Sequence, residues 1–169
     1  MSPLIFFLIQ LSILAYALVA GVFLAFSDFI MRSLAITGGV GGVEAMQVIN
    51  REVFRWVFMA LFIGMAPVSL LVAVYGGVFV GPGSGTVMMI AGLLYFIGCF
   101  GVTVCFNVPL NEALAGMDVS SESTRDFWQQ TYVPRWTFWN SVRTVASGLA
   151  AALLLFSLLW MTQSQTQTL

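Results

Sequence analysis

Histidine and lysine are absent from this sequence of 169 residues, and charged residues of all kinds make up only 8% of it. Without histidine, the chain can form neither a histidine-based acid–base step nor a histidine-ligated metal site, and we expect no metal. Soluble domains average about 25% charged residues, whereas 60% of this chain is hydrophobic. Water is therefore not its main solvent. The formal net charge is −1 and no basic run occurs, so we expect no nucleic-acid partner.

Four hydrophobic runs are long enough to cross a bilayer, which takes about 20 helical residues. They cover approximately residues 3–28, 54–80, 86–107 and 136–160. Their period is helical, and the alternating ten-residue strands of a membrane β-barrel are missing. The length fits one domain. We therefore predict an all-α fold for residues 1–169, an integral membrane four-helix bundle in contact with the lipid bilayer.

The first connection has the pattern of an interfacial helix. From Val43 to Trp56, apolar residues alternate with charged and polar ones, which is typical of a helix that lies at the membrane surface. A second short helix is expected in the polar connection 112–134. These two interfacial helices flank the same end of the predicted bundle.

Small residues recur at four-residue spacing inside the runs, as at Ala17 and Gly21, Ala60 and Gly64, and Ser147 with Ala151. Such spacing lets membrane helices approach closely where lipid provides no hydrophobic drive. We therefore expect these positions at the contacts between helices.

The arginines predict the orientation of the chain. All six lie in or beside the first and third connections, and every acidic residue lies at the same end. The positive-inside rule places these two connections in the cytoplasm and both termini outside it.

Two polar clusters lie at the cytoplasmic ends of hydrophobic runs. One is the segment 107–112, with sequence NVPLNE; the other begins the last run, where Trp136, Asn140 and Arg143 share one helix face. Anchoring at the headgroup level explains an isolated Arg or Trp. Two clusters at one level instead predict a polar pocket, in which Arg143 contacts an acidic or asparagine side chain of another helix.

Four stretches together resemble the anthrone oxygenase-like membrane proteins, a family otherwise described as a domain of unknown function. They are GVFLAFSDFIM at 21–31, EAMQVIN at 44–50, NVPLN at 107–111 and WTFWNSVRT at 136–144. The resemblance extends over nearly the whole chain. It implies a four-helix integral membrane protein, which we expect in the inner membrane of a bacterium. Some fungal relatives oxidise anthrones to anthraquinones with molecular oxygen, while most bacterial members have no assigned activity.

One function that this resemblance implies is an oxidoreductase acting without a cofactor on a flat, membrane-soluble aromatic. A base, Asp28 or Glu112, would remove the activated C–H proton, with burial raising the pKa of that carboxyl towards the working pH. Donors that would stabilise the enolate oxygen are Arg143, Asn107, Asn111 and Asn140. Two indole rings, those of Trp136 and Trp139, would stack on the substrate.

The same polar residues also fit a protein without catalytic activity. They would then link helix ends in a small-molecule-binding protein, in a homo-oligomer or in a subunit of a larger membrane complex. A channel or transporter is disfavoured because no ionisable residue lies near the middle of any predicted span. The sequence leaves the enzymatic and the non-catalytic hypotheses open.

Overall fold

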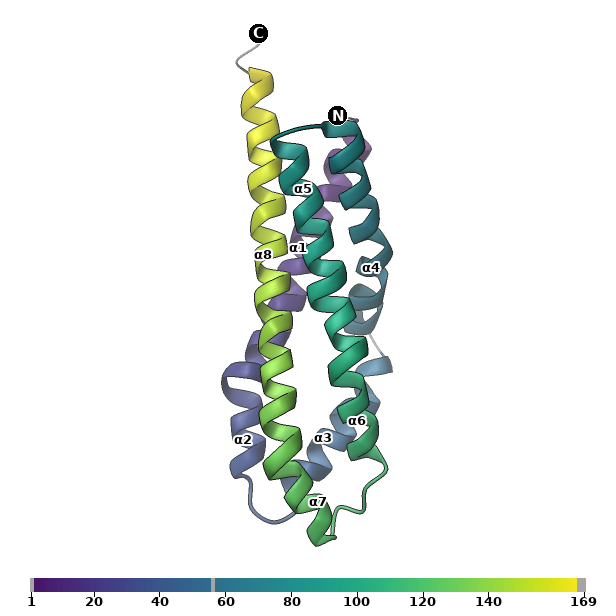
Figure 1. Cartoon of the computed structure of the whole chain (residues 1–169), viewed down its shortest axis with the longest axis vertical. Coiled ribbons are helices and arrows are strands. Elements are labelled where there is room, and N and C mark those ends of the chain that lie inside the picture. Colours follow the sequence, from purple (N-terminus) through teal and green to yellow (C-terminus); the bar gives the residue numbers. More distant parts are fainter. Residues whose placement is uncertain (1, 56, 167–169) are drawn as a thin grey trace.

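The computed structural model describes residues 2–55 and 57–166, with side chains as far as Ser164. Within these residues every regular element is helical and no strand occurs, and four helices are long and apolar enough to cross a membrane (Figure 1). The predicted all-α membrane bundle is therefore confirmed. Trp56, the end of the expected interfacial helix, lies outside the described residues.

The four membrane helices are each assembled from consecutive segments, several of them π-helical. The first comprises α1 (Pro3–Ala25), η1 (Phe26–Ile30) and α2 (Met31–Ile36); the second comprises α4 (Val57–Tyr75) and η3 (Gly76–Val80). The third comprises α5 (Ser84–Leu93), η4 (Leu94–Gly101), η5 (Thr103–Asn107) and α6 (Val108–Ala115); the fourth comprises α7 (Glu122–Phe127), η6 (Trp128–Tyr132) and α8 (Val133–Thr166). Three of them are longer than the predicted spans. With 34 residues, α8 alone is roughly 51 Å long against a hydrocarbon core of about 30 Å.

Most of the extra length lies at one end of the molecule, where α2, α6 and α7 lie around the interfacial helix α3 (Gly41–Glu52), which continues into η2 (Val53–Arg55) (Figure 1). The C-terminal end of α8 projects beyond the other helices at the opposite end (Figure 1). Gln47 of α3 donates hydrogen bonds to the carbonyls of Leu114 (2.8 Å) and Met117 (3.1 Å). These bonds attach α3 to the C-terminal end of α6 and to the turn that follows it. Both termini of the bundle lie at the opposite end (Figure 1).

The molecule has two hydrophobic cores, which follow one another along its long axis. The membrane core includes Tyr16 and Tyr95, whose rings stack with centroids 4.3 Å apart, and the Tyr16 hydroxyl shares a hydrogen bond of 2.7 Å with Ser69. The second core lies among α2, α3, α6 and the start of the fourth helix, and consists of Met31, Val43, Met46, Leu114, Trp128, Tyr132 and Trp136. The candidate site lies where these two cores meet.

The small-residue spacing predicts only part of the helix contacts: Ser147 and Ala151 are buried, but the closest glycine contacts lie at other positions. A Cβ on Gly92 would overlap the Ser69 carbonyl oxygen, and one on Gly76 would lie 2.6 Å from the Gly85 carbonyl oxygen. By contrast, a Cβ on Gly21 or Gly64 would meet no atom within 4 Å. The prediction of helix contacts at Gly21 and Gly64 is therefore wrong: both lie on the outer surface of the bundle.

This difference predicts opposite effects of one substitution at two glycines. Gly92→Leu is expected to destabilise the bundle by about 3 kcal/mol or more, because its side chain would overlap the backbone of α4. Gly21→Leu is expected to leave stability within about 0.5 kcal/mol. Thermal unfolding of both variants in one detergent measures the contrast, and equal melting temperatures would contradict the packing described here.

Candidate functional site

A cavity of about 350 Å³ lies between the two cores, bounded by all four membrane helices and by α3. Its wall is mainly apolar, and its aromatic members are Phe23, Phe26, Phe54, Phe58, Phe62, Phe100 and Trp136. Neighbouring rings of this wall contact each other, as Phe23 and Phe58 do edge to face with centroids 5.7 Å apart. Such a wall suits a flat aromatic ligand, which can stack on these rings.

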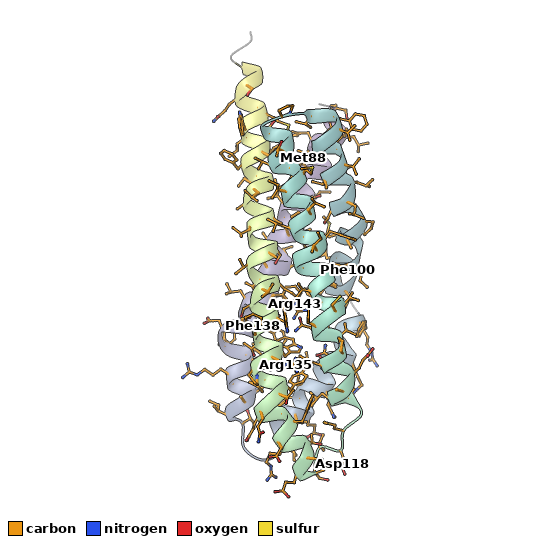
Figure 2. The ribbon with its side chains drawn as sticks, viewed as in Figure 1. Met88, Phe100, Asp118, Arg135, Phe138 and Arg143 are labelled. Carbon is orange, nitrogen blue, oxygen red and sulfur yellow. The ribbon has the colours of Figure 1, made fainter. Side chains whose placement is uncertain are left out.

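Arg143 provides the charged part of the wall. It lies inside the bundle at a level between Phe100 and Arg135 (Figure 2). Its Nη2 donates to Asn140 Oδ1 (2.6 Å) and its Nη1 donates to Thr103 Oγ1 (3.2 Å). The guanidinium carbon lies 4.1 Å from the centroid of the Phe23 ring, a cation–π contact worth about 0.5–2 kcal/mol.

No acidic side chain of the described residues pairs with this arginine. Arg143 is only 4% exposed, and the one ion pair among the described residues joins Arg55 to Glu52 at the surface. The Arg143 Nε is buried and makes no hydrogen bond with any described residue. A buried charge costs several kcal/mol unless a partner compensates it. The cavity is therefore complementary to a ligand that presents a negatively charged oxygen.

Asn140 fixes the direction of the guanidinium. This asparagine is fully buried, and its Nδ2 donates to the carbonyl of Phe23 and to Ser27 Oγ, both at 2.6 Å. Its Oδ1 is thereby turned towards Arg143. The amide thus links the last membrane helix to the first and holds the arginine against the cavity.

A second polar group of the cavity wall is Asn111 of α6. Its Oδ1 accepts hydrogen bonds from the Tyr132 hydroxyl and from Trp136 Nε1, both at 2.8 Å. Asn50 of α3 also lines the cavity and donates to the Tyr132 hydroxyl at 3.2 Å. This network fixes the Trp136 ring as part of the aromatic wall.

Asn107 lies behind the wall instead of in it. Its Nδ2 donates to the Trp136 carbonyl at 3.2 Å, while its fully buried Oδ1 has no partner among the described residues. The structure thus assigns Asn107 a positioning contact between the third and fourth membrane helices.

The structure places Asn111 and Arg143 in one cavity wall, whereas Asn107 and Asn140 bind residues of that wall without lining the cavity. One expected contact is wrong. Arg143 contacts an asparagine of its own helix, Asn140, and its partner on another helix is Thr103. The reason is spacing, because Asn140 lies three residues before Arg143 on the same helix face.

Other candidates lie outside the cavity wall. Asp28 and Glu112 have exposed side chains and are not among the lining residues. Trp139 stacks on Phe106 with centroids 3.7 Å apart and does not line the cavity either. The role of either carboxylate as general base therefore stays a prediction, and a direct contact with a ligand in this cavity is not available to them in the structure.

Sequence reasoning did not single out Thr103, Asn50 or Tyr132. Thr103 stands alone in an apolar run, where a threonine usually bonds its own helix, as this one also does with the Cys99 carbonyl (2.8 Å). Asn50 belongs to the stretch 44–50 that carries the family resemblance, and that resemblance was the one sequence feature that marked Asn50 as a candidate site residue. The wall phenylalanines gave no signal, because aromatic residues fill lipid-facing and inward positions alike.

The family of anthrone oxygenases matches residues 52–153 of this chain. The matched region includes Thr103, Asn111, Trp136 and Arg143, while the wall residues of α1 and α3 precede it. No curated protein and no solved structure gives a match.

Proposed function

Because this chain belongs to the anthrone oxygenase family, we propose that it oxidises a membrane-soluble polycyclic aromatic with molecular oxygen and without a cofactor. The observation that carries the proposal is Arg143, a buried cation without an acidic partner that faces an aromatic cavity. A few polar groups in a mainly apolar cavity are typical of small-molecule sites.

The reaction needs charge stabilisation more than it needs a cofactor. An anthrone loses a proton from its methylene carbon and becomes an enolate, with negative charge shared between that carbon and the carbonyl oxygen. The carbon gives up electrons to oxygen, a C–O bond forms, and the protonated hydroperoxide loses water to leave a second carbonyl. One anthrone and one oxygen molecule thus give one anthraquinone and one water. In this scheme the Arg143 guanidinium stabilises the enolate oxygen, a contribution that typically reaches 10²–10³-fold in rate.

Asp28 or Glu112 is expected to take the proton only through water, because neither lines the cavity. Glu112→Gln is therefore expected to change the rate of oxygen uptake by less than about twofold. Loss of a general base in direct contact would instead lower the rate by roughly 10²-fold or more. An oxygen electrode distinguishes these results, with Asp28→Asn measured in parallel; a 10²-fold loss in either variant would identify that carboxylate as the base.

Oxygen uptake by the purified protein in lipid nanodiscs tests the proposal itself. Addition of an anthrone is expected to consume one oxygen molecule per anthraquinone formed, at a rate proportional to protein concentration. Empty nanodiscs give the rate of spontaneous oxidation. If the protein adds nothing to that rate, the proposed activity is wrong.

A second candidate function is non-catalytic binding of the same class of aromatic. The position of both candidate carboxylates outside the cavity favours it, because no carboxylate among the lining residues is placed to take a proton. Binding of a hydroxyanthraquinone without any oxygen uptake from an anthrone would support this candidate.

We further propose that both termini lie outside the cytoplasm of a bacterial inner membrane, as the arginine distribution predicts. In a Cys105→Ser background, a cysteine at Ser164 is expected to react with an impermeant maleimide in intact cells. A cysteine at Ser123, in α7, is expected to react only after the cells are opened. The reverse pattern would overturn the orientation. The remaining native thiol, Cys99, is buried and serves as the unlabelled background.

A further inference from the structure

The cavity is open towards the lipid-facing surface of the bundle. Several residues line it and are also exposed on the outside: Val22 (39%), Ile63 (50%), Val104 (50%) and Phe54 (66%). A residue that is both part of the wall and exposed marks the opening. All four are apolar, which suits an opening that faces hydrocarbon instead of water.

A shallow groove on the outer surface of α4 continues from this opening. The groove and the cavity share Phe54, Met59 and Ile63. Beyond these residues the groove is lined by Arg55 and Val57 at its near end and by Ala60 and Gly64 along α4, and a Cβ on Gly64 would meet no atom within 4 Å. The small side chains therefore leave a path along α4 that starts at the cavity.

The polar groups fix the direction of a ligand in this space. Arg143 and Asn111 are largely covered parts of the wall, whereas the opening is entirely apolar. A ligand whose oxygen contacts Arg143 therefore directs its opposite, apolar edge towards the opening and the groove.

We propose that the site takes its ligand directly from the bilayer and accepts a hydroxylated or enolisable aromatic that carries one apolar chain, with the rings in the cavity and the chain in the α4 groove. This inference rests on the proposed function for the ring-binding part. A chain in the groove replaces a lipid acyl chain of equal apolarity, so its transfer is nearly neutral in free energy. The groove thus permits a chain without adding much affinity, whereas a closed cavity would reject it.

Binding of two hydroxyanthraquinones in nanodiscs, one unsubstituted and one with a decyl chain, tests the inference without depending on turnover. The wild-type protein is expected to bind both. Gly64→Trp and Ala60→Trp fill the groove and are expected to weaken binding of the decyl compound by tenfold or more, while binding of the unsubstituted compound changes less than about twofold. Gly148→Trp is the matched control, because Gly148 of α8 has equally open surroundings and lines neither the cavity nor the groove.

The wild-type result separates the inference from the proposed function. Binding of the unsubstituted compound alone would overturn the groove proposal and leave the ring site standing. Binding of neither compound would overturn both. If the two groove variants affect both compounds equally, or neither compound, the groove does not hold the chain and the inference is wrong.

Discussion

Replacing Arg143 by lysine is expected to slow oxygen uptake by roughly 10²-fold or more. Lysine keeps the positive charge but loses the planar fork of donors. In the structure this fork contacts Asn140 and Thr103 with two nitrogens and has its Nε without a partner among the described residues. One ammonium group cannot hold both contacts and a ligand oxygen in the same geometry. The oxygen electrode measures the rate, and thermal unfolding in detergent measures the fraction of folded protein.

Arg135→Lys is the matched control, because Arg135 lies two turns earlier on the same helix with an exposed side chain. It is expected to keep the wild-type rate and stability. If Arg143→Lys instead keeps the rate per folded molecule and loses about 1–3 kcal/mol of stability, the arginine only links helices. That result would favour the non-catalytic hypothesis.

The sequence was sufficient to predict the bundle because each of its signals is physical and local. Apolar runs of more than 20 residues require spanning helices, and the amphipathic pattern from Val43 predicts α3, which the structure contains. Helix contacts were harder to predict, because spacing alone cannot tell an inward glycine from a lipid-facing one. Gly92 packs against backbone and Gly64 faces outward, although both are glycines in apolar runs.

The polar residues of the site were predictable in part. Polar side chains are rare in this chain, so Asn107, Asn111, Asn140 and Arg143 stand out, and the structure places Asn111 and Arg143 in one cavity wall with the other two bound to residues of that wall. Which of these residues line the cavity and which lie behind it depends on how each helix is rotated about its own axis. A π-helical segment such as η5 changes that rotation locally. Exposure of Asp28 and Glu112 could not be read from the sequence, because both lie at helix positions that point either inward or outward depending on that rotation.

Giving Arg143 a carboxylate partner is expected to remove the function while keeping the fold. Thr103 is suited to this change, because its hydroxyl accepts a hydrogen bond from Arg143 Nη1 and lines the cavity. Thr103→Asp would place a negative charge beside the guanidinium, whereas Thr103→Asn has nearly the same size without the charge. We expect Thr103→Asp to slow oxygen uptake by roughly 10²-fold, and Thr103→Asn to remain within a few fold of the wild type.

The most direct test of an unpaired cation in the cavity is the ionisation of a bound hydroxyanthraquinone, whose colour changes when its hydroxyl loses a proton. A nearby positive charge favours the anion and lowers the pKa of the ligand. In the wild type and in Thr103→Asn, the bound dye is expected to ionise at a pH lower by about one or more than in protein-free nanodiscs, which corresponds to about 1.4 kcal/mol or more. In Thr103→Asp, this lowering is expected to disappear. If the dye ionises at the same pH in Thr103→Asp as in Thr103→Asn, Arg143 does not act on the ligand oxygen, and the account of the site is wrong.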